Sequence, residues 1–366
     1  MSSKSGVALL FSSEATPEHE RESFKAVGTR IARLLGLPYQ GIYTPGASSF
    51  ARPYFVPSDT LVGIENQRTL SIHGESDFFG GLVAQPFMGT KAISHPLHDS
   101  ATSRPEGWTE DFYNIAAGAV LPGYTAFSIQ DALVAGAEML RSGTIRVKPV
   151  LGRAGKGQSV ITGIDELQAL LEQMDESELA IWGLVLEENL TDVITYSVGQ
   201  VRLGGTVASY CGTQRLTRDN TGQLVYGGSD LRVVRGDYPE LQQLGLPAQY
   251  MRAVLCAQQY ERAALESLPG IVLSRRNYDI AEGTNARGER VTGVLEQSWR
   301  IGGASGAEVL AIEILSADES LTQVQTSTLE IYGKDAEPPA GATVVYSGED
   351  SEVGHLTKCV RANHDS

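Results

Sequence analysis

The stretch TIRVKPVLGRAGKGQSVI, residues 144–161, sets a glycine-rich turn between two short apolar segments. The segments 144–150 and 159–161 carry the β-branched residues that are enriched in strands. Glycines in the turn let backbone N–H groups come close to an anion such as a phosphate. The stretch therefore predicts a strand, a glycine flap and a second strand, with Lys148 near the end of the first strand. The flap glycines are Gly152, Gly155 and Gly157.

Two common phosphate-binding loops are excluded by the positions of these glycines. A Walker A loop would need a glycine where Val150 stands and a serine or threonine where Gly157 stands. The dinucleotide-binding glycine pattern is not met either, and the turn leads into a strand, so no helix N-terminus faces a phosphate. Two interpretations remain open: a different kind of nucleotide flap, or a plain glycine hairpin with exposed Arg153 and Lys156.

Length and composition limit the class of protein. A chain of 366 residues is long enough for two or three subdomains, and 42% hydrophobic with 20% charged residues is typical of a globular protein. The net charge of −15 argues against a general nucleic-acid or acidic-membrane surface, but not against an anionic ligand in a local basic pocket. Cys211, Cys256 and Cys359 lack metal-site spacing and are expected to be small buried hydrophobic residues. No signal peptide or membrane-spanning run is evident, which predicts a cytoplasmic protein.

The order of the predicted elements indicates an α/β fold, α+β in part. A strand at 6–11 leads into a helix that ends at Leu35, with Thr16 as its predicted cap, Pro17 in the first helical position and Gly36 as its stop. Residues 97–119 are polar and predict a linker or mobile segment. Further along come a helix capped by Ser128, a hairpin at 194–216 turning at Gly204 and Gly205, a helix at 247–267 and strands at 271–281 and 290–298.

The segment LVLEENL, residues 184–190, is a strand that ends in acids. Adenine needs a dry slot at a strand end, and ribose hydroxyls favour a carboxylate. Glu187 or Glu188 would face such a slot, with Leu190 packing on the base. The alternative is that both acids are solvated residues of a turn.

Two further acids lie on consecutive predicted strands. Asp279 in the NYD segment and Glu296 in the LEQS segment would meet at one end of an antiparallel pair. Mg²⁺ prefers carboxylate and phosphate oxygens, so this pair suits a Mg–nucleotide. Ordinary edge charges are the alternative interpretation.

Taken in chain order, these motifs resemble the ATP-grasp superfamily over roughly residues 85–320. The resemblance implies an ATP-grasp fold with an N-terminal βα pre-ATP-grasp domain. The whole chain also resembles a bacterial family grouped with ATP-grasp enzymes, through strings such as YFVPSDTLVG, TYSVGQVR and GTQRLTRDN, and that resemblance names no substrate. The implied divisions are an N-terminal domain (1–105), a linker and helix (106–143), a lid with flap and hinge (144–192), a C-terminal subdomain with the metal site (193–335) and a terminal strand and tail (336–366).

The resemblance also assigns roles to residues. Lys148 and the flap contact phosphate, Lys91 is similar to the earlier ATP lysine, and the hinge residues Glu187, Glu188, Asn189 and Leu190 surround base and ribose. Asp279 and Glu296 bind Mg²⁺, with Mn²⁺ as an alternative ion. Arg300 serves the reacting phosphoryl or acyl group, Arg215 and Arg218 reach the γ-phosphate or a substrate carboxylate, and Gly302 and Gly303 keep the backbone close to the substrate.

Two positions depart from the family pattern. Ser298 stands two residues after the glutamate, where the family has asparagine, and its hydroxyl would be a weaker metal ligand. Thr195 stands where an acid often precedes the post-hinge strand, so the residue that contacts the ribose is left open.

The implied activity is that of an ATP-dependent enzyme, a carboxylate–amine ligase that forms an acyl phosphate and releases ADP and phosphate. A carboxylate–thiol ligase, a kinase or regulatory nucleotide binder of the same fold, and a non-nucleotide α/β protein are the alternatives. The expected partners are small carboxylate and amine substrates and a second copy of the chain in a homodimer, with no nucleic acid and no membrane.

Overall fold

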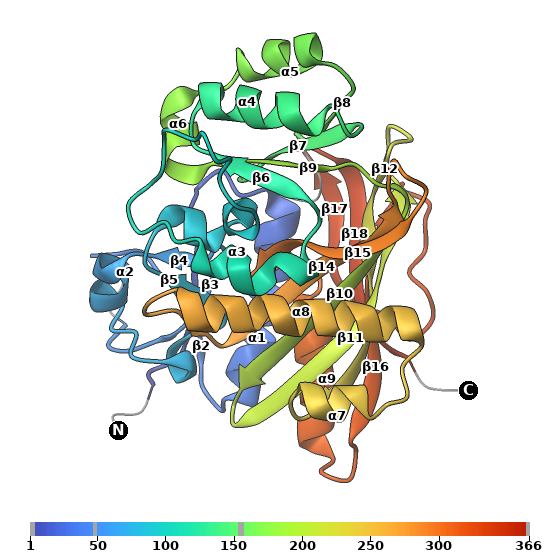
Figure 1. Cartoon of the computed structure of the whole chain (residues 1–366). Coiled ribbons are helices and arrows are strands. Elements are labelled where there is room, and N and C mark those ends of the chain that lie inside the picture. Colours follow the sequence, from blue (N-terminus) through green and yellow to red (C-terminus); the bar gives the residue numbers. More distant parts are fainter. Residues whose placement is uncertain (1–3, 47–49, 153–156, 364–366) are drawn as a thin grey trace.

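The computed structural model describes residues 4–46, 50–152 and 157–363 of the chain. Four β-sheets carry the architecture, and helices cover the larger ones (Figure 1). A four-stranded sheet with its helices sits at the top of the view, above an eight-stranded sheet that includes the last strands of the chain.

The N-terminal sheet is a parallel βα unit, as predicted. Strands β1 (Val7–Leu10), β2 (Tyr39–Ile42) and β3 (Tyr54–Pro57) lie in the order β2-β1-β3, and α1 (Glu18–Leu34) joins the first two. Gly36 follows the helix with φ of 63°, which confirms it as the stop. The predicted cap is wrong: Pro17 itself takes the cap position without a side-chain bond, and the Thr16 hydroxyl donates to the Ser13 carbonyl at 2.9 Å.

A second small sheet ties distant parts of the chain together. Strands β4 (Leu61–Val62) and β5 (Gly81–Val83) pair in parallel, and β13 (Val272–Leu273) adds to β5 from the C-terminal half. The short helices of this region are α2 (Ile64–Thr69), η1 (Glu75–Asp77), η2 (Pro86–Gly89) and η3 (Lys91–Ser94).

The four-stranded sheet, which we call the lid sheet, contains β6 (Gly123–Ala126), β7 (Ile145–Pro149), β8 (Ser159–Ile161) and β9 (Leu184–Glu188) in the order β6-β9-β7-β8. Its helices are α4 (Ile129–Met139), α5 (Ile164–Leu171) and α6 (Glu176–Trp182). Ser128 caps α4 by accepting from the Asp131 N–H at 3.1 Å, which confirms that prediction. Because β6 pairs with β9, the sheet starts within the segment 106–143 that the sequence pattern assigns to a linker and helix. The domain divisions stay a prediction.

The predicted linker at 97–119 is wrong, because this segment folds onto the core. It contains α3 (Asp111–Ala116) and η4 (Ala117–Ala119), and α3 packs against α8 (Ala248–Ser267). Phe112 is 2% exposed, and its ring centroid lies 4.9 Å from that of Tyr260. Phe112 and Ala116 are spaced by four residues and so share the buried side of a short helix, a pattern too brief to stand out among polar neighbours.

The eight-stranded sheet, which we call the large sheet, is antiparallel throughout, in the order β15-β14-β10-β11-β12-β16-β18-β17. Its strands are β10 (Thr191–Leu203), β11 (Thr206–Arg218), β12 (Leu224–Arg235), β14 (Arg275–Thr284), β15 (Arg290–Ser298), β16 (Gln323–Tyr332), β17 (Thr343–Asp350) and β18 (Gly354–Asn363). The hairpin turn at Gly204 and Gly205 is confirmed, with φ of 60° and 84°.

Side chains alternate along these strands, and each face of the large sheet packs on a different helix. One face, with Tyr196, Tyr278 and Val294, packs on α8 and lies next to α7 (Tyr238–Gln242). The other, with Tyr210 and Leu231, packs on α9 (Ser305–Ala317) and α1. Helix α8 crosses the sheet in Figure 1.

The cysteines behave largely as expected. Cys211 and Cys359 are buried and unbonded to sulfur, and Cys256 is half-buried. Burial raises the pKa of Cys211 to about 12, so this thiol is inert at neutral pH. Among the described residues, no helix is long and apolar enough to cross a membrane.

Candidate functional site

Two lysine–glutamate pairs, each with a buried lysine, lie near one another, between the lid sheet and the large sheet. Lys148 Nζ on β7 lies 2.5 Å from Glu187 Oε1 on β9, and both side chains are 2% exposed. Lys91 Nζ on η3 lies 2.5 Å from Glu296 Oε2 on β15, and this lysine is 4% exposed. Lys91 and Glu296 both act electrostatically on Lys148. We call these four residues the charged cluster.

Strand register explains the first pair. Glu187 lies opposite Arg146 on β7, so it is the diagonal neighbour of Lys148 on one face of the lid sheet. Burial, the largest effect, lowers the pKa of Lys148, and the Glu187 carboxylate opposes it. Burial also acts to raise the pKa of Glu187, but Lys148 and His95 outweigh it and hold that pKa below its usual range. The pair therefore places the Lys148 side chain directly against a carboxylate in the protein interior.

The second oxygen of Glu187 faces His95. His95 is fully buried, and its Nε2 lies 3.3 Å from Glu187 Oε2, while its Nδ1 has no hydrogen-bond partner among the described residues. Gly123 leaves room for the ring, since a Cβ there would come within 3.0 Å of it. Both oxygens of Glu187 are thus held by the protein, and its side chain orients Lys148 instead of facing open space at the strand end.

The other hinge residues line the end of β9 in different ways. Leu190 is buried in a small apolar cluster with Leu121 and Ala281. The Asn189 side-chain oxygen accepts from Arg146 at 2.8 Å. Glu188 is half-buried, and burial, the largest effect, raises its pKa. An apolar wall with a polar rim is therefore present at this strand end.

The two acids of the predicted metal site are direct partners across β14 and β15. Asp279 lies opposite Glu296 in the register, as the sequence pattern predicts. Burial and then the charge of Glu296 raise the pKa of Asp279 to about 6. Asn277 donates to Asp279 Oδ1 at 2.8 Å, and Gln214 on β11 also hydrogen-bonds to Asp279. The site thus gathers negative charge that the fold does not fully neutralise.

Ser298, the third predicted metal ligand, is engaged by an arginine. Arg275 Nη1 donates to Ser298 Oγ at 3.1 Å and to the Ser298 carbonyl at 2.8 Å. Arg275 is 1% exposed and forms a two-point ion pair with Glu308 on α9 at 2.9 and 2.6 Å. Tyr210 on β11 completes this buried network, which holds α9 against the sheet.

The two arginines assigned to catalysis take different positions. Arg300 follows β15 and donates to the Ile301 carbonyl at 2.7 Å, while its own carbonyl accepts from Arg275. Arg215 lies 3.1 Å from Asp230 and donates to the Thr328 carbonyl at 2.9 Å. Gln214, one residue earlier, hydrogen-bonds to Asp279 instead. Arg300 is therefore tied to the metal-site network, and Arg215 to a neighbouring ion pair.

The flap is described only in part. Lys91 Nζ lies 3.4 Å from the Gly152 carbonyl, so the start of the flap touches the charged cluster. Gly157 has φ of 77°, a backbone conformation that favours glycine. Gly155, Arg153 and Lys156 lie outside the described residues.

The glycines after Arg300 have a packing role. A Cβ at Gly302 would lie 2.9 Å from the Arg300 guanidinium, and one at Gly303 would lie 2.8 Å from the ring of Tyr226. Their approach to a substrate stays a prediction.

Several residues of the site escape the sequence pattern. His95, Gln214, Arg275 and Glu308 come from separate elements and carry no local motif. Asn277 could have been predicted from the sequence as a neighbour of the acids, because it stands two residues before Asp279 and strand residues two apart share a face.

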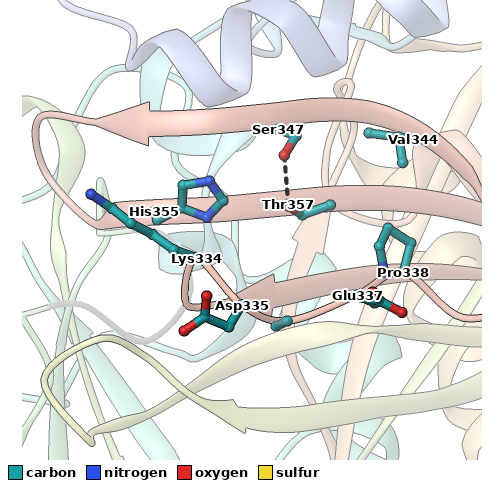
Figure 2. A pocket seen from close by; sticks show the side chains of 9 residues that line it. Lys334, Asp335, Glu337, Pro338, Val344, Ser347, His355 and Thr357 are labelled. Carbon is teal, nitrogen blue, oxygen red and sulfur yellow. Dashed lines mark hydrogen bonds between the residues drawn. The ribbon is translucent and has the colours of Figure 1, made fainter.

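A surface pocket lies away from these residues. It has a volume of about 410 Å³ and is formed by β17, β18 and the loop after β16, with Lys334, Glu337 and His355 in its lining (Figure 2). Ser347 on β17 and Thr357 on β18, which both line it, hydrogen-bond to each other between the two strands at 2.9 Å. No predicted site residue lines it. Within residues 4–46, 50–152 and 157–363, no group of three or more His, Cys, Asp and Glu residues is arranged to hold a metal, so the acids of the site form a pair.

A family model described as "Protein of unknown function (DUF3182)" matches residues 7–360. The comparison with curated proteins finds no significant match.

Solved structures match the whole architecture. N5-carboxyaminoimidazole synthetase from Staphylococcus aureus, complexed with ADP, is 12% identical, and the match covers 100% of this chain and 95% of that one with a TM-score of 0.52. The biotin carboxylase domain of the Hydrogenobacter thermophilus 2-oxoglutarate carboxylase, with MgADP, ADP and bicarbonate, is 12% identical. The match covers 99% of this chain and 87% of that one, with a TM-score of 0.52. Biotin carboxylase from Campylobacter jejuni, in a βγ-ATP complex, is 12% identical. The match covers 98% of this chain and 88% of that one, with a TM-score of 0.50. The fold is therefore the ATP-grasp fold preceded by a βα domain, which confirms the predicted fold class.

Proposed function

This chain belongs to the DUF3182 family, and we propose that it is an ATP-dependent ligase that activates a carboxylate as an acyl phosphate and couples it to an amine. One observation carries the proposal: buried Lys148 and Lys91 sit at the junction of lid and large sheet, beside the Asp279–Glu296 pair. This arrangement brings cations for phosphate next to acids for a divalent metal. The nucleotide complexes of the structural neighbours support the nucleotide part.

The charged cluster suits a site that is filled by an anion. In the protein alone, each lysine Nζ lies 2.5 Å from a glutamate oxygen, so the glutamates occupy the positions that an anion would take. ATP phosphates would compete with these carboxylates for Lys148 and Lys91. The apolar wall at Leu190 would take the base, and Glu188 and Asn189 lie at the rim for the ribose.

The donor set also fits a divalent cation. Asp279 and Glu296 are carboxylates placed face to face, and the raised pKa of Asp279 reflects burial and negative charge that a cation would offset. They would hold Mg²⁺, or Mn²⁺ in its place, with Ser298 at the position where the family pattern has asparagine. The ion would supply charge neutralisation for the phosphates.

In the proposed reaction, a carboxylate oxygen forms a bond to the γ-phosphorus while the bond from that phosphorus to the β–γ bridging oxygen breaks, and ADP leaves. The amine then attacks the acyl carbon, phosphate leaves with its electron pair, and the amine loses a proton. Arg300, four residues after Glu296, would stabilise the oxyanion charge in both steps, with Arg215 as the second cation. Catalysis of this kind rests on positioning and on exclusion of water.

A nucleotide binder or kinase of the same fold is the second candidate. The bond from Arg275 to Ser298 favours it, because a hydroxyl that already serves a guanidinium is a weak replacement for the usual asparagine. A screen for ADP release over carboxylates, amines and thiols separates the candidates, because a ligase needs both an acid and a second substrate. Cytoplasmic location and a homodimer are part of the proposal.

The products give the direct test of the chemistry. With an ¹⁸O-labelled carboxylate substrate, we expect one label to appear in inorganic phosphate and ADP to be the nucleotide product. The label moves because the attacking oxygen leaves with phosphorus when the amine displaces it. Mass spectrometry of the phosphate measures it, and AMP with pyrophosphate as products would contradict γ-phosphoryl transfer.

Lys148→Ala is expected to weaken ATP binding by about 10- to 100-fold, because a charge-assisted contact to phosphate contributes about 1.5–3 kcal/mol. Titration with a fluorescent ATP analogue measures the loss. Lys148→Ala leaves the Glu187 carboxylate buried without its partner, and adding Glu187→Gln removes that unpaired charge. A loss of ATP affinity that persists in the double variant is then due to binding and not to folding. Lys358→Ala is the matched control, since this lysine pairs with Glu330 between β16 and β18. An unchanged affinity of the Lys148 variant for ATP would remove Lys148 from the phosphate site.

A further inference from the structure

The asparagine that the family pattern places after the metal glutamate has a counterpart on the neighbouring strand. In the pairing of β14 with β15, Asn277 lies opposite Ser298, just as Asp279 lies opposite Glu296. Opposed residues of an antiparallel pair share a face, and so do residues two apart. Asn277 therefore lies on the same face of the large sheet as Asp279 and Glu296. It is directly opposite Ser298, the position where the family pattern has asparagine.

The hydrogen bonds around Asn277 compete for one proton. The Tyr210 hydroxyl lies 2.6 Å from Glu308 Oε1 and 2.9 Å from Asn277 Oδ1, and a hydroxyl has a single proton to donate. The carboxylate gives the shorter and charge-assisted bond, so the proton goes to Glu308. With Asn277 Oδ1 on the side of Tyr210, a lone pair of the tyrosine hydroxyl then faces a lone pair of the Asn277 carbonyl.

Rotation of the amide by half a turn removes this conflict and creates another. Asn277 Nδ2 would then donate to Tyr210, but its Oδ1 would lie beside Asp279 Oδ1, where Nδ2 now donates at 2.8 Å. Two adjacent oxygens repel each other unless a cation lies between them. The same two oxygens are the ligands that Mg²⁺ prefers, so the rotated amide suits the metal-bound state.

Ser298 is poorly placed for that role. Its Oγ accepts from Arg275 at 3.1 Å, and a guanidinium stays charged at any relevant pH. A cation bound to this oxygen would face the charge of Arg275 and compete for the same electrons.

We infer that Asn277, and not Ser298, supplies the third protein oxygen for the divalent cation, by turning its amide carbonyl toward Asp279 and its amide nitrogen toward Tyr210. This inference rests on the proposed function, which requires a metal at Asp279 and Glu296. It makes the buried Tyr210–Glu308–Arg275 network part of the support of the metal site.

Binding of Mn²⁺ in the presence of ADP, followed by electron paramagnetic resonance, tests the inference without any turnover. Asn277→Ser is expected to weaken Mn²⁺ binding at least about 10-fold, and Ser298→Ala by less than about 3-fold. The double variant N277S/S298N places an asparagine at position 298, directly opposite residue 277. We expect most of the Mn²⁺ affinity to return in this variant. Asn285→Ser, in the turn between β14 and β15, is the matched control.

The outcomes separate the two proposals. A wild-type protein that binds no Mn²⁺ with ADP overturns the proposed metal site and with it the function. Wild-type binding that Asn277→Ser leaves unchanged, or that Ser298→Ala weakens more than Asn277→Ser does, overturns this inference alone. If Asn277→Ser fails to fold, Tyr210→Phe takes its place, with an expected loss of about 3- to 10-fold, because the rotated amide loses its acceptor. Unchanged Mn²⁺ affinity in Tyr210→Phe would also overturn the inference.

Discussion

Glu308→Ala is expected to lower the free energy of unfolding by about 3–5 kcal/mol, because it leaves the buried guanidinium of Arg275 without its carboxylate. Glu308 is fully buried and accepts two bonds from Arg275 and one from Tyr210. The side chain thus fixes α9 to β11 and β14 at once. Little water can reach the site to replace these bonds, since Arg275 is 1% exposed.

Urea unfolding of the unliganded protein measures this loss. Glu349→Ala is the matched control, because its pair with Lys334 is exposed on both sides and contributes well under about 1 kcal/mol. A loss below about 1 kcal/mol for Glu308→Ala would contradict the expected role, since another group would then have to neutralise Arg275.

The fold was predictable where local patterns and packing agree. The hairpin of β10 and β11 turns at its predicted glycines, because strand alternation and a two-glycine turn select the same register. Strands β7 and β8 were predictable for the same reason, because two apolar segments flank a glycine-rich turn and pair as an antiparallel hairpin. Helix α3 was missed because its stability comes from contact with α8, as Phe112 against Tyr260 illustrates, and such contacts leave no mark in local composition.

The site was predictable in its charged residues and not in their partners. Lys148, Asp279 and Glu296 stand in short sequence motifs on or beside apolar strands, where they could be recognised. The pairing of Lys148 with Glu187 joins residues 39 positions apart and depends on the register of β7 with β9. The pairing of Lys91 with Glu296 depends on how η3 packs against β15 of the large sheet. Ser298 shows the same limit: its position in the motif suggests a ligand, whereas its bond to Arg275 is set by the packing of α9.

Asp279→Asn and Glu296→Gln are each expected to lower turnover at least about 100-fold, with much of the ATP binding retained. A carboxamide keeps the shape of the side chain but loses the charge that holds a divalent cation. Lys148 and Lys91 remain to bind the phosphates in both variants. Steady-state kinetics at physiological Mg²⁺, with nucleotide titration beside it, measures the two properties separately. Glu282→Gln on β14 is the matched control, because this acid pairs with Arg252 and Arg290 instead.

Thermal unfolding of Asp279→Asn distinguishes a lost metal ligand from a damaged fold. Burial and the charge of Glu296 both oppose a negative charge on Asp279, which is why its pKa is raised to about 6. A neutral asparagine removes that repulsion, so the unliganded variant is expected to unfold at a higher temperature than the wild type while losing turnover. Inactivation together with lower stability would point to a structural role for Asp279, and near wild-type turnover in both variants would exclude the pair as the metal site. Higher stability with lost activity is the result that only a functional acid, held against its own electrostatic preference, would give.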